Sequence, residues 1–123
     1  MSDKSQSEHR QERRKFVRVS IYAVTRYFCL ARNQEIGVQT RLSDISEGGA
    51  MLVTFDEGIP IDTEISVSFV LPGPNEEFVS AKAIVRHSGF LEENLFRSGV
   101  EFTKLSKAHL EAIRRYVRQK SGL

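Results

Sequence analysis

Alternation of apolar and polar residues predicts a chain built mainly from short β-strands. In the segment 64–71 every second residue is apolar, namely Ile65, Val67, Phe69 and Leu71. A period of two residues is typical of a strand that buries one face and exposes the other. We therefore expect a strand here whose apolar face lies in the core.

Weaker versions of the same signal predict five further strands, over residues 19–31, 35–42, 50–54, 78–87 and 95–103. In the second of these we expect one face to carry Ile36, Val38, Thr40 and Leu42. Asn33-Gln34 predicts a hairpin turn before this strand, and the prolines in residues 72–75 forbid ladder pairing there. Residues 89–94 are expected to connect the last two strands.

The hydrophobic period changes to that of a helix at the end of the chain. Ser106 is a suitable N-cap, and Leu110, Ile113, Tyr116 and Val117 follow at helical spacing. We predict a helix at about residues 105–120, with His109 at the solvated surface of its first turn. Six antiparallel strands and one amphipathic helix predict a mainly β fold, a six-stranded antiparallel barrel with a C-terminal α-helix as its lid.

Residues 1–12 contain no apolar side chain after Met1, which predicts a flexible N-terminal arm followed by one domain over residues 13–121. The net charge of +2 hides a segregation along the chain. Residues 1–41 hold nine Lys/Arg and four Asp/Glu, residues 42–102 hold three and eleven, and residues 103–123 hold six and one. The basic ends indicate an anionic partner, or else they complement the acidic middle.

Several function classes lack the residues they require. The single cysteine allows no intrachain disulfide, and no apolar run suits a secretory signal or a membrane span, so we expect a cytoplasmic protein. The three histidines are far apart, and the spacings of zinc, calcium, phosphate-loop and nucleophile-elbow motifs do not occur. We therefore expect no metal, no cofactor and no catalytic residues.

Two clusters stand out from this background. Residues 13–18, Arg-Arg-Lys-Phe-Val-Arg, place four cations where the arm meets the first strand. Residues 44–49, Asp-Ile-Ser-Glu-Gly-Gly, form a DxSxxG sequence predicted to be a tight turn between strands. Taken singly, each has an ordinary explanation as a solvated basic run or an Asx turn.

The combination of an RxxxR sequence from Arg14 to Arg18 with DxSxxG one hairpin later resembles the PilZ domain family over about residues 12–119. Further likeness lies in the strands at residues 83–86 and 99–102 and in the closing helix. The resemblance implies a six-stranded barrel that binds the bacterial second messenger cyclic di-GMP.

By this resemblance, Arg14 and Arg18 would clamp phosphate and the Hoogsteen edges of guanine, while Asp44, Ser46 and Gly49 would contact the ligand. The chemistry is suitable. A guanidinium pairs bidentately with phosphate or with guanine O6 and N7. An ionised carboxylate accepts from the adjacent N1–H and N2–H₂ donors of guanine, and a glycine lets a ligand approach the backbone closely.

The residue before the RxxxR motif is Arg13, and in the family a cation there is associated with binding a stacked, intercalated pair of cyclic di-GMP molecules. Arg13 thus favours a ligand dimer, whose four phosphates attract an extra cation. Arg10, Gly48 and Arg86 are weaker candidates, and Arg86 faces outward on the fifth strand.

The resulting hypothesis is a cyclic di-GMP receptor without enzymatic activity, in which binding orders the N-terminal arm and changes the surface shown to an unknown downstream protein partner. Two alternatives stay open. One is a PilZ-like protein-interaction module that does not bind nucleotide. The other is a small β-barrel for single-stranded nucleic acid, which is disfavoured because the aromatic residues fall mostly in core-compatible strands over an acidic middle.

Overall fold

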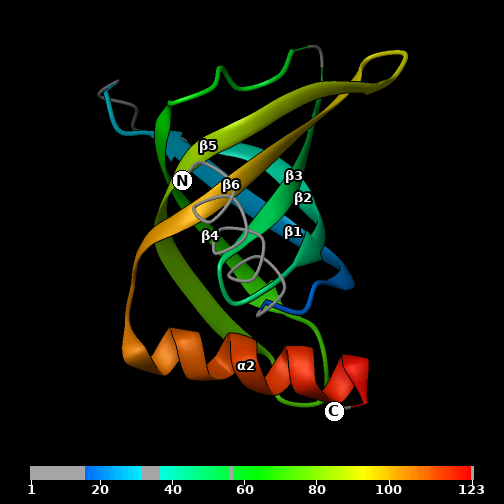
Figure 1. Ribbon diagram of the computed structural model, residues 1–123, viewed down its shortest axis with the longest axis vertical. Helices are drawn as coiled ribbons and strands as arrows, with labels where there is room; N and C mark the ends of the chain where they lie inside the picture. The colour runs from blue at the N-terminus through cyan, green and yellow to red at the C-terminus, as the bar shows by residue number, and fades with distance from the viewer. Residues whose placement is uncertain (1–15, 32–36, 56, 123) are drawn as a thin grey trace, which may run out of the picture.

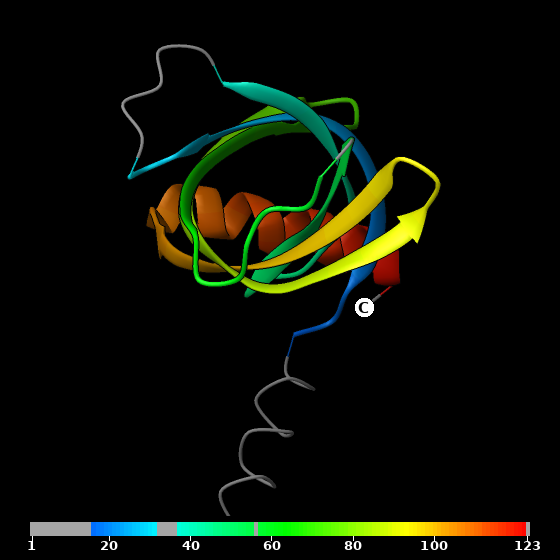
Figure 2. The same ribbon diagram turned by 90° about the horizontal axis from the view of Figure 1, so that it is seen from above.

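The computed structural model describes residues 16–31, 37–55 and 57–122. These residues form six antiparallel strands that close into a barrel in the order β1-β2-β3-β6-β5-β4 (Figures 1 and 2). The strands are β1 (Val19–Cys29), β2 (Val38–Ile45), β3 (Gly49–Phe55), β4 (Glu64–Leu71), β5 (Glu77–Glu92) and β6 (Leu95–Leu105), and the helix is α2 (Lys107–Ser121). The expected barrel with a C-terminal helix is confirmed. The arm expected over residues 1–12 lies outside the described residues.

Alternation along the strands places the core inside the barrel. All four apolar residues expected inward in β4 are at most 3% exposed. The inward side chains of the other strands meet them and form one cluster, which includes Leu42, Ile45, Leu52, Val79, Val85 and Val100. Complete burial of an aliphatic side chain of this size contributes about 1.5–3 kcal/mol. The barrel is therefore a filled core rather than a channel.

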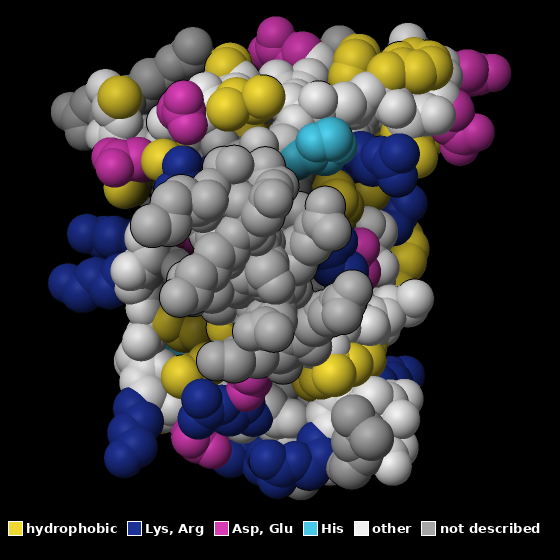
Figure 3. Space-filling view, viewed as in Figure 1, with side chains coloured by type: hydrophobic (Ala, Val, Ile, Leu, Met, Phe, Trp, Pro, Cys, Tyr) yellow, Lys and Arg dark blue, Asp and Glu magenta, His cyan; other side chains and the backbone are white. Residues whose placement is uncertain are grey.

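Helix α2 lies across one end of the barrel, where Figure 2 shows it behind the ring of strands. As predicted, Ser106 is the N-cap, and its hydroxyl oxygen accepts a hydrogen bond from the His109 amide at 3.1 Å. The buried stripe consists of Ala112, Ile113, Tyr116 and Val117. Lys and Arg side chains gather along the outer side of the helix (Figure 3).

His109 differs from its predicted surface position. It is half-buried, its Nδ1 lies 3.3 Å from the Ser80 amide nitrogen and 3.1 Å from the Ser80 carbonyl oxygen, and its ring packs edge-on against Phe78. The prediction was wrong because the first turn of α2 lies against β5, a contact between segments far apart in the sequence. His109 thus helps to hold the helix on the barrel.

The second strand begins and ends later than predicted. β2 continues to Ile45, so Asp44 belongs to the strand and the turn is shorter than the DxSxxG sequence. Pairing with β3 shifts register between Leu42 and Asp44, which indicates a bulge that redirects the end of the strand. Val38, expected on the buried face, is 41% exposed because the strand starts at the open rim of the barrel. The expected turn at residues 33–34 lies outside the described residues.

The hairpin of β5 and β6 is longer than predicted. Residues 89–92, expected to form a connection, belong to β5, and only residues 93–94 make the turn. Gly89 pairs with Arg97 and Phe90 with Phe96, so cross-strand contacts continue where the sequence pattern is irregular. The hairpin consequently projects beyond the ring of strands (Figure 2).

Candidate functional site

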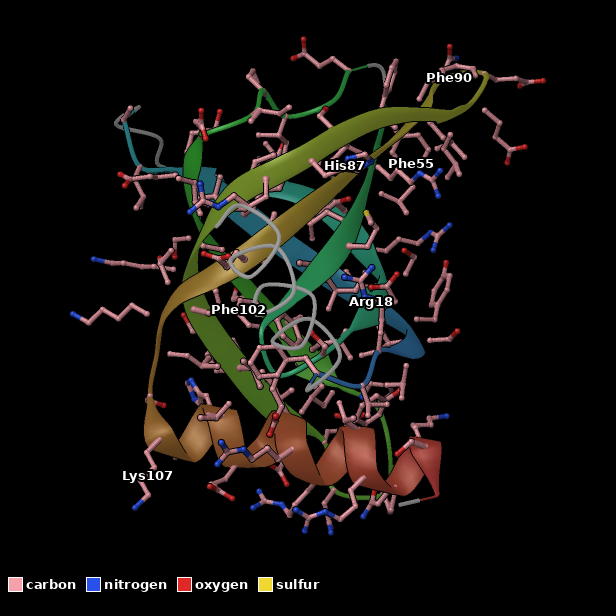
Figure 4. The ribbon with its side chains drawn as sticks, viewed as in Figure 1. Arg18, Phe55, His87, Phe90, Phe102 and Lys107 are labelled. Carbon is pink, nitrogen blue, oxygen red and sulfur yellow. The ribbon has the colours of Figure 1, made fainter. Side chains whose placement is uncertain are left out.

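Arg18 and Asp44 lie side by side at the outer surface of the barrel. Arg18 immediately precedes β1, and Asp44 pairs across the ladder with Ser20 near the end of β2. The Arg18 Nε atom lies 3.5 Å from the Asp44 Oδ1 atom, and the two side chains are 62% and 25% exposed. The structure thus brings together one residue of each sequence motif, with the guanidinium open to solvent (Figure 4).

The carboxylate of Asp44 is incompletely satisfied. Its Oδ1 atom is buried and accepts no hydrogen bond among the described residues, although it forms the ion pair with Arg18. Burial raises the pKa of Asp44 above its ordinary value, while the charges of Arg18 and Arg97 act to lower the pKa. A buried acceptor without a hydrogen bond costs folding free energy, about 1–3 kcal/mol, and native proteins keep few of them.

Arg97 was not identified from the sequence. It lies on β6, paired with Val53 of the neighbouring strand, and is exposed. Arg97 belongs to no sequence motif, and only the pairing of distant strands in the barrel brings its charge near Asp44. Among the described residues, the charges of Arg18 and Arg97 both act on the carboxylate, and the sequence motifs indicated only Arg18.

The turn after Asp44 is held by Ser46. Its amide and its hydroxyl both donate to the Gly49 carbonyl oxygen, at 2.8 and 3.4 Å, and its hydroxyl oxygen accepts from the Gly48 amide at 3.2 Å. Ser46 is 6% exposed. These bonds fix the shape of the turn and thereby the position of the carboxylate that precedes it.

The two glycines of the turn have neighbours within the chain. A Cβ atom on Gly49 would lie 2.0 Å from the Val100 carbonyl oxygen of β6, so the close approach of two backbones requires glycine. A Cβ atom on Gly48 would meet the Phe16 ring at 3.0 Å, and the Gly48 carbonyl accepts from the Phe102 amide at 2.9 Å. Ligand contact by Gly49, expected from the resemblance, stays a prediction beside this packing role.

The turn is also connected to the helix. Glu47, one of the variable positions of DxSxxG, accepts a hydrogen bond from the Arg114 side chain of α2. Arg114 also donates to Glu111, one turn earlier in the helix, at 3.0 Å. Sequence reasoning missed Glu47 because its partner lies far along the chain. The candidate site is thus anchored to the lid of the barrel.

Among the described residues, the weaker candidate Arg86 does not join this site. Arg86 is exposed, and its guanidinium lies 3.7 Å from Asp62 and 3.4 Å from Glu101, so its charge is compensated on a different part of the surface. Arg10, Arg13 and Arg14 lie outside the described residues. The described site therefore consists of a solvated guanidinium, a half-buried carboxylate and a rigid turn.

This arrangement can bind a ligand that offers both an acceptor face and hydrogen-bond donors. The open guanidinium of Arg18 suits a phosphate or the acceptor edge of a base, and the free lone pairs of Asp44 suit N–H donors. Within residues 16–31, 37–55 and 57–122, no group of three His, Cys, Asp or Glu side chains is placed to hold a metal ion. No helix in that part of the chain is long and apolar enough to cross a membrane.

Comparisons with known proteins agree with the fold. The family model described as PilZ domain matches residues 12–119. The fold is similar to the Bacillus subtilis inhibitor of motility MotI/DgrA, with TM-score 0.75 and 16% identity, covering 87% of this chain and 50% of that one. It is also similar to the PilZ domain of Escherichia coli YcgR with c-di-GMP, with TM-score 0.68 and 14% identity, covering 89% and 92% of the two chains. The chain thus spans half the length of MotI/DgrA, and no curated protein sequence matches it significantly.

Proposed function

Because the chain belongs to the PilZ domain family, we propose that it is a receptor for cyclic di-GMP and that Arg18 and Asp44 bind the nucleotide. The observation that carries the proposal is the pair of Arg18 and Asp44, one residue from each motif, whose Nε and Oδ1 atoms lie 3.5 Å apart and whose side chains are 62% and 25% exposed. The YcgR domain of similar fold has a structure with c-di-GMP. The proposed role of Arg18 and Asp44 follows from the hydrogen-bonding chemistry of a guanidinium and a carboxylate.

Guanine supplies the donors that Asp44 lacks. Its N1–H and N2–H₂ groups point in parallel toward one carboxylate, whereas adenine presents no such pair. Arg18 offers its guanidinium to phosphate oxygens or to guanine O6 and N7. Each charge-assisted hydrogen bond to a buried group is worth about 1.5–3 kcal/mol, which corresponds to a tenfold or larger change in affinity.

Arg13 and Arg14 complete the proposed site, although they lie outside the described residues. In the proposal, bound nucleotide holds both of them against the barrel and thereby orders the N-terminal arm, and the altered surface is presented to a protein partner. Arg13 adds the cation needed by a stacked pair of nucleotides with four phosphates. The proposed location is the cytoplasm, which suits a chain with a single cysteine.

Isothermal titration calorimetry with cyclic di-GMP tests the proposal. We expect binding by the wild-type protein and at least about tenfold weaker binding by Arg18→Ala and by Asp44→Ala. Arg26→Ala is the matched control, since Arg26 is an exposed cation on β1, the strand that Arg18 precedes. A stoichiometry near two that falls toward one in Arg13→Ala would support the stacked pair.

Each negative outcome has a definite meaning. No heat with cyclic di-GMP, or equal binding by Asp44→Ala and the wild type, would reject the receptor function and leave an interaction module without nucleotide. Salt-dependent retention of random oligonucleotides that cyclic di-GMP does not compete would instead indicate a single-stranded nucleic-acid binder.

A further inference from the structure

The projecting part of the β5–β6 hairpin has a strand edge that the barrel does not use. β4 pairs with β5 only as far as Ile84, and the last contacts on that side are backbone bonds from Val85 to Thr63 and from Asp62 to Val85. On its other side β5 is paired with β6 from His87 to Phe90 and at Glu92, with register shifts at Arg86 and Leu91. In the part of the chain that the structure describes, no backbone hydrogen bond reaches the outer edge of residues 86–92.

Protein sheets rarely leave such an edge open. An unpaired edge is a template for another extended segment, and proteins usually protect it with charged residues, proline, β-bulges or a covering loop. Here the register shifts and the charged residues Arg86 and Glu92 stand at the two ends, and the stretch from His87 to Phe90 between them is regular. Residues 86–92 contain no lysine and no proline. The loop after β3 approaches the side chain of Ser88 and not its backbone: a Cβ on Gly58 would lie 2.7 Å from the Ser88 Oγ atom.

Exposed apolar side chains accompany this edge. Phe90 is 63% exposed although its ring packs against Phe96, with ring centres 5.9 Å apart, and the adjacent Leu91 is 38% exposed. Phe55, at the end of β3, is 66% exposed and pairs with Leu95 of the same hairpin. Figure 3 shows apolar side chains gathered at this upper end of the molecule, and Figure 4 shows Phe55 and Phe90 at the hairpin.

The charges at the tip are negative. Glu92 and Glu93 follow the apolar pair and are exposed, and Glu57 lies two residues after Phe55 and is also exposed. The nearby cation Arg86 is already compensated by two carboxylates. Arg97, which pairs with Gly89 across the hairpin, is also exposed, but the three carboxylates outnumber it. The tip therefore favours a cationic partner.

We propose that the outer edge of β5 from Arg86 to Glu92 is a docking site for an extended, basic segment of a partner protein, which adds as a strand to the barrel. Main-chain hydrogen bonds to the open edge provide affinity, and alternate side chains of the segment cover Phe90 and Leu91. Lysine or arginine side chains of the segment pair with Glu92 and Glu93. This site is separate from the nucleotide site and does not depend on nucleotide binding.

Amide hydrogen exchange of the free protein tests the open edge. Amides of residues 87–92 that point away from β6 are expected to exchange at least about tenfold faster than those bonded to β6. Uniformly slow exchange along residues 87–92 would mean that the edge is already covered, and it would overturn the proposal.

A display library of random nonapeptides, selected on the intact protein, tests the partner chemistry. We expect enriched peptides to carry at least two cations around alternating apolar residues, and to slow exchange at the β5 edge. Binding is expected to fall about tenfold in Phe90→Ser and to persist in Phe78→Ser. Phe78 is the matched control, because it is 59% exposed on the same strand, in the stretch that β4 covers.

Backbone methylation distinguishes strand addition from side-chain contact alone. Alternate amides of an extended peptide point to opposite edges, so one version of a selected peptide is N-methylated at the odd residues and another at the even residues. We expect the version that keeps the amides facing β5 to bind and the other version to fail. Absence of enriched peptides, equal binding of both versions, or equal binding by Phe90→Ser contradicts the proposal. Self-association that Phe90→Ser abolishes would identify a second copy as the occupant and would overturn the assignment to a basic partner segment.

Discussion

Replacing Asp44 by alanine is expected to stabilise the nucleotide-free protein while it removes nucleotide binding. The substitution deletes a buried acceptor that accepts no hydrogen bond among the described residues, and such an acceptor costs about 1–3 kcal/mol. It also removes the attraction to Arg18, whose side chain is 62% exposed, so that pair is worth about 0–1 kcal/mol. The difference predicts a gain of about 1 kcal/mol in the free energy of unfolding.

The gain is measurable by denaturant and thermal unfolding without nucleotide. For a domain of this size, about 1 kcal/mol corresponds to an increase in Tm of about 3–6 °C. Glu64→Ala is the control, because Glu64 is an exposed carboxylate at the start of β4 and its loss should change stability by less than about 0.5 kcal/mol. A destabilisation of Asp44→Ala by about 1 kcal/mol or more would refute the reasoning.

The same reasoning predicts a pH dependence. Since burial raises the pKa of Asp44 in the folded state above that of the unfolded chain, the folded state binds the proton more tightly. The contribution of Asp44 to the free energy of unfolding is therefore most favourable below the pKa of the unfolded chain, and it is lost as pH rises through the pKa of the folded state. The gain in the free energy of unfolding from Asp44→Ala should be largest near neutral pH and vanish at low pH, where the carboxyl is protonated in both states.

Nucleotide affinity should depend on pH in the opposite direction. Because guanine donors require the ionised carboxylate, affinity should fall as pH drops through the raised pKa of Asp44.

Two further substitutions test the scaffold around the site. Gly49→Ala should destabilise the barrel by about 3 kcal/mol or more, measured by urea unfolding, because its Cβ would lie 2.0 Å from the Val100 carbonyl oxygen. Gly89→Ala is its control, since a Cβ there meets only an ordinary contact at 3.6 Å, and equal losses in both variants would contradict the explanation. His109→Ala should lower the free energy of unfolding by about 1 kcal/mol, because it removes the hydrogen bond to the Ser80 backbone. Unchanged unfolding and unchanged amide exchange in the helix would show that this contact does not hold it.

Local patterns in the sequence were sufficient for the main elements of the fold. An apolar residue at every second position of residues 64–71 predicted β4, and Ser106 with the apolar residues that follow it predicted α2. These predictions succeed because the strand period, the helix period and the N-cap bond are set by neighbouring residues. The RxxxR and DxSxxG motifs together likewise identified the family, and the structure brings Arg18 and Asp44, one residue of each motif, together.

Closure of the barrel decided the features that local patterns could not reach. Three features depend on segments that are far apart in the sequence. They are the effect of the Arg97 charge on Asp44, the hydrogen bond between Glu47 and Arg114, and the close approach of Val100 that requires glycine at position 49. The open edge of β5 is also a tertiary property, because it depends on where β4 stops pairing. Residue order determines which side chains alternate, but burial, electrostatic fields and free edges depend on distances between chain segments that meet only after folding.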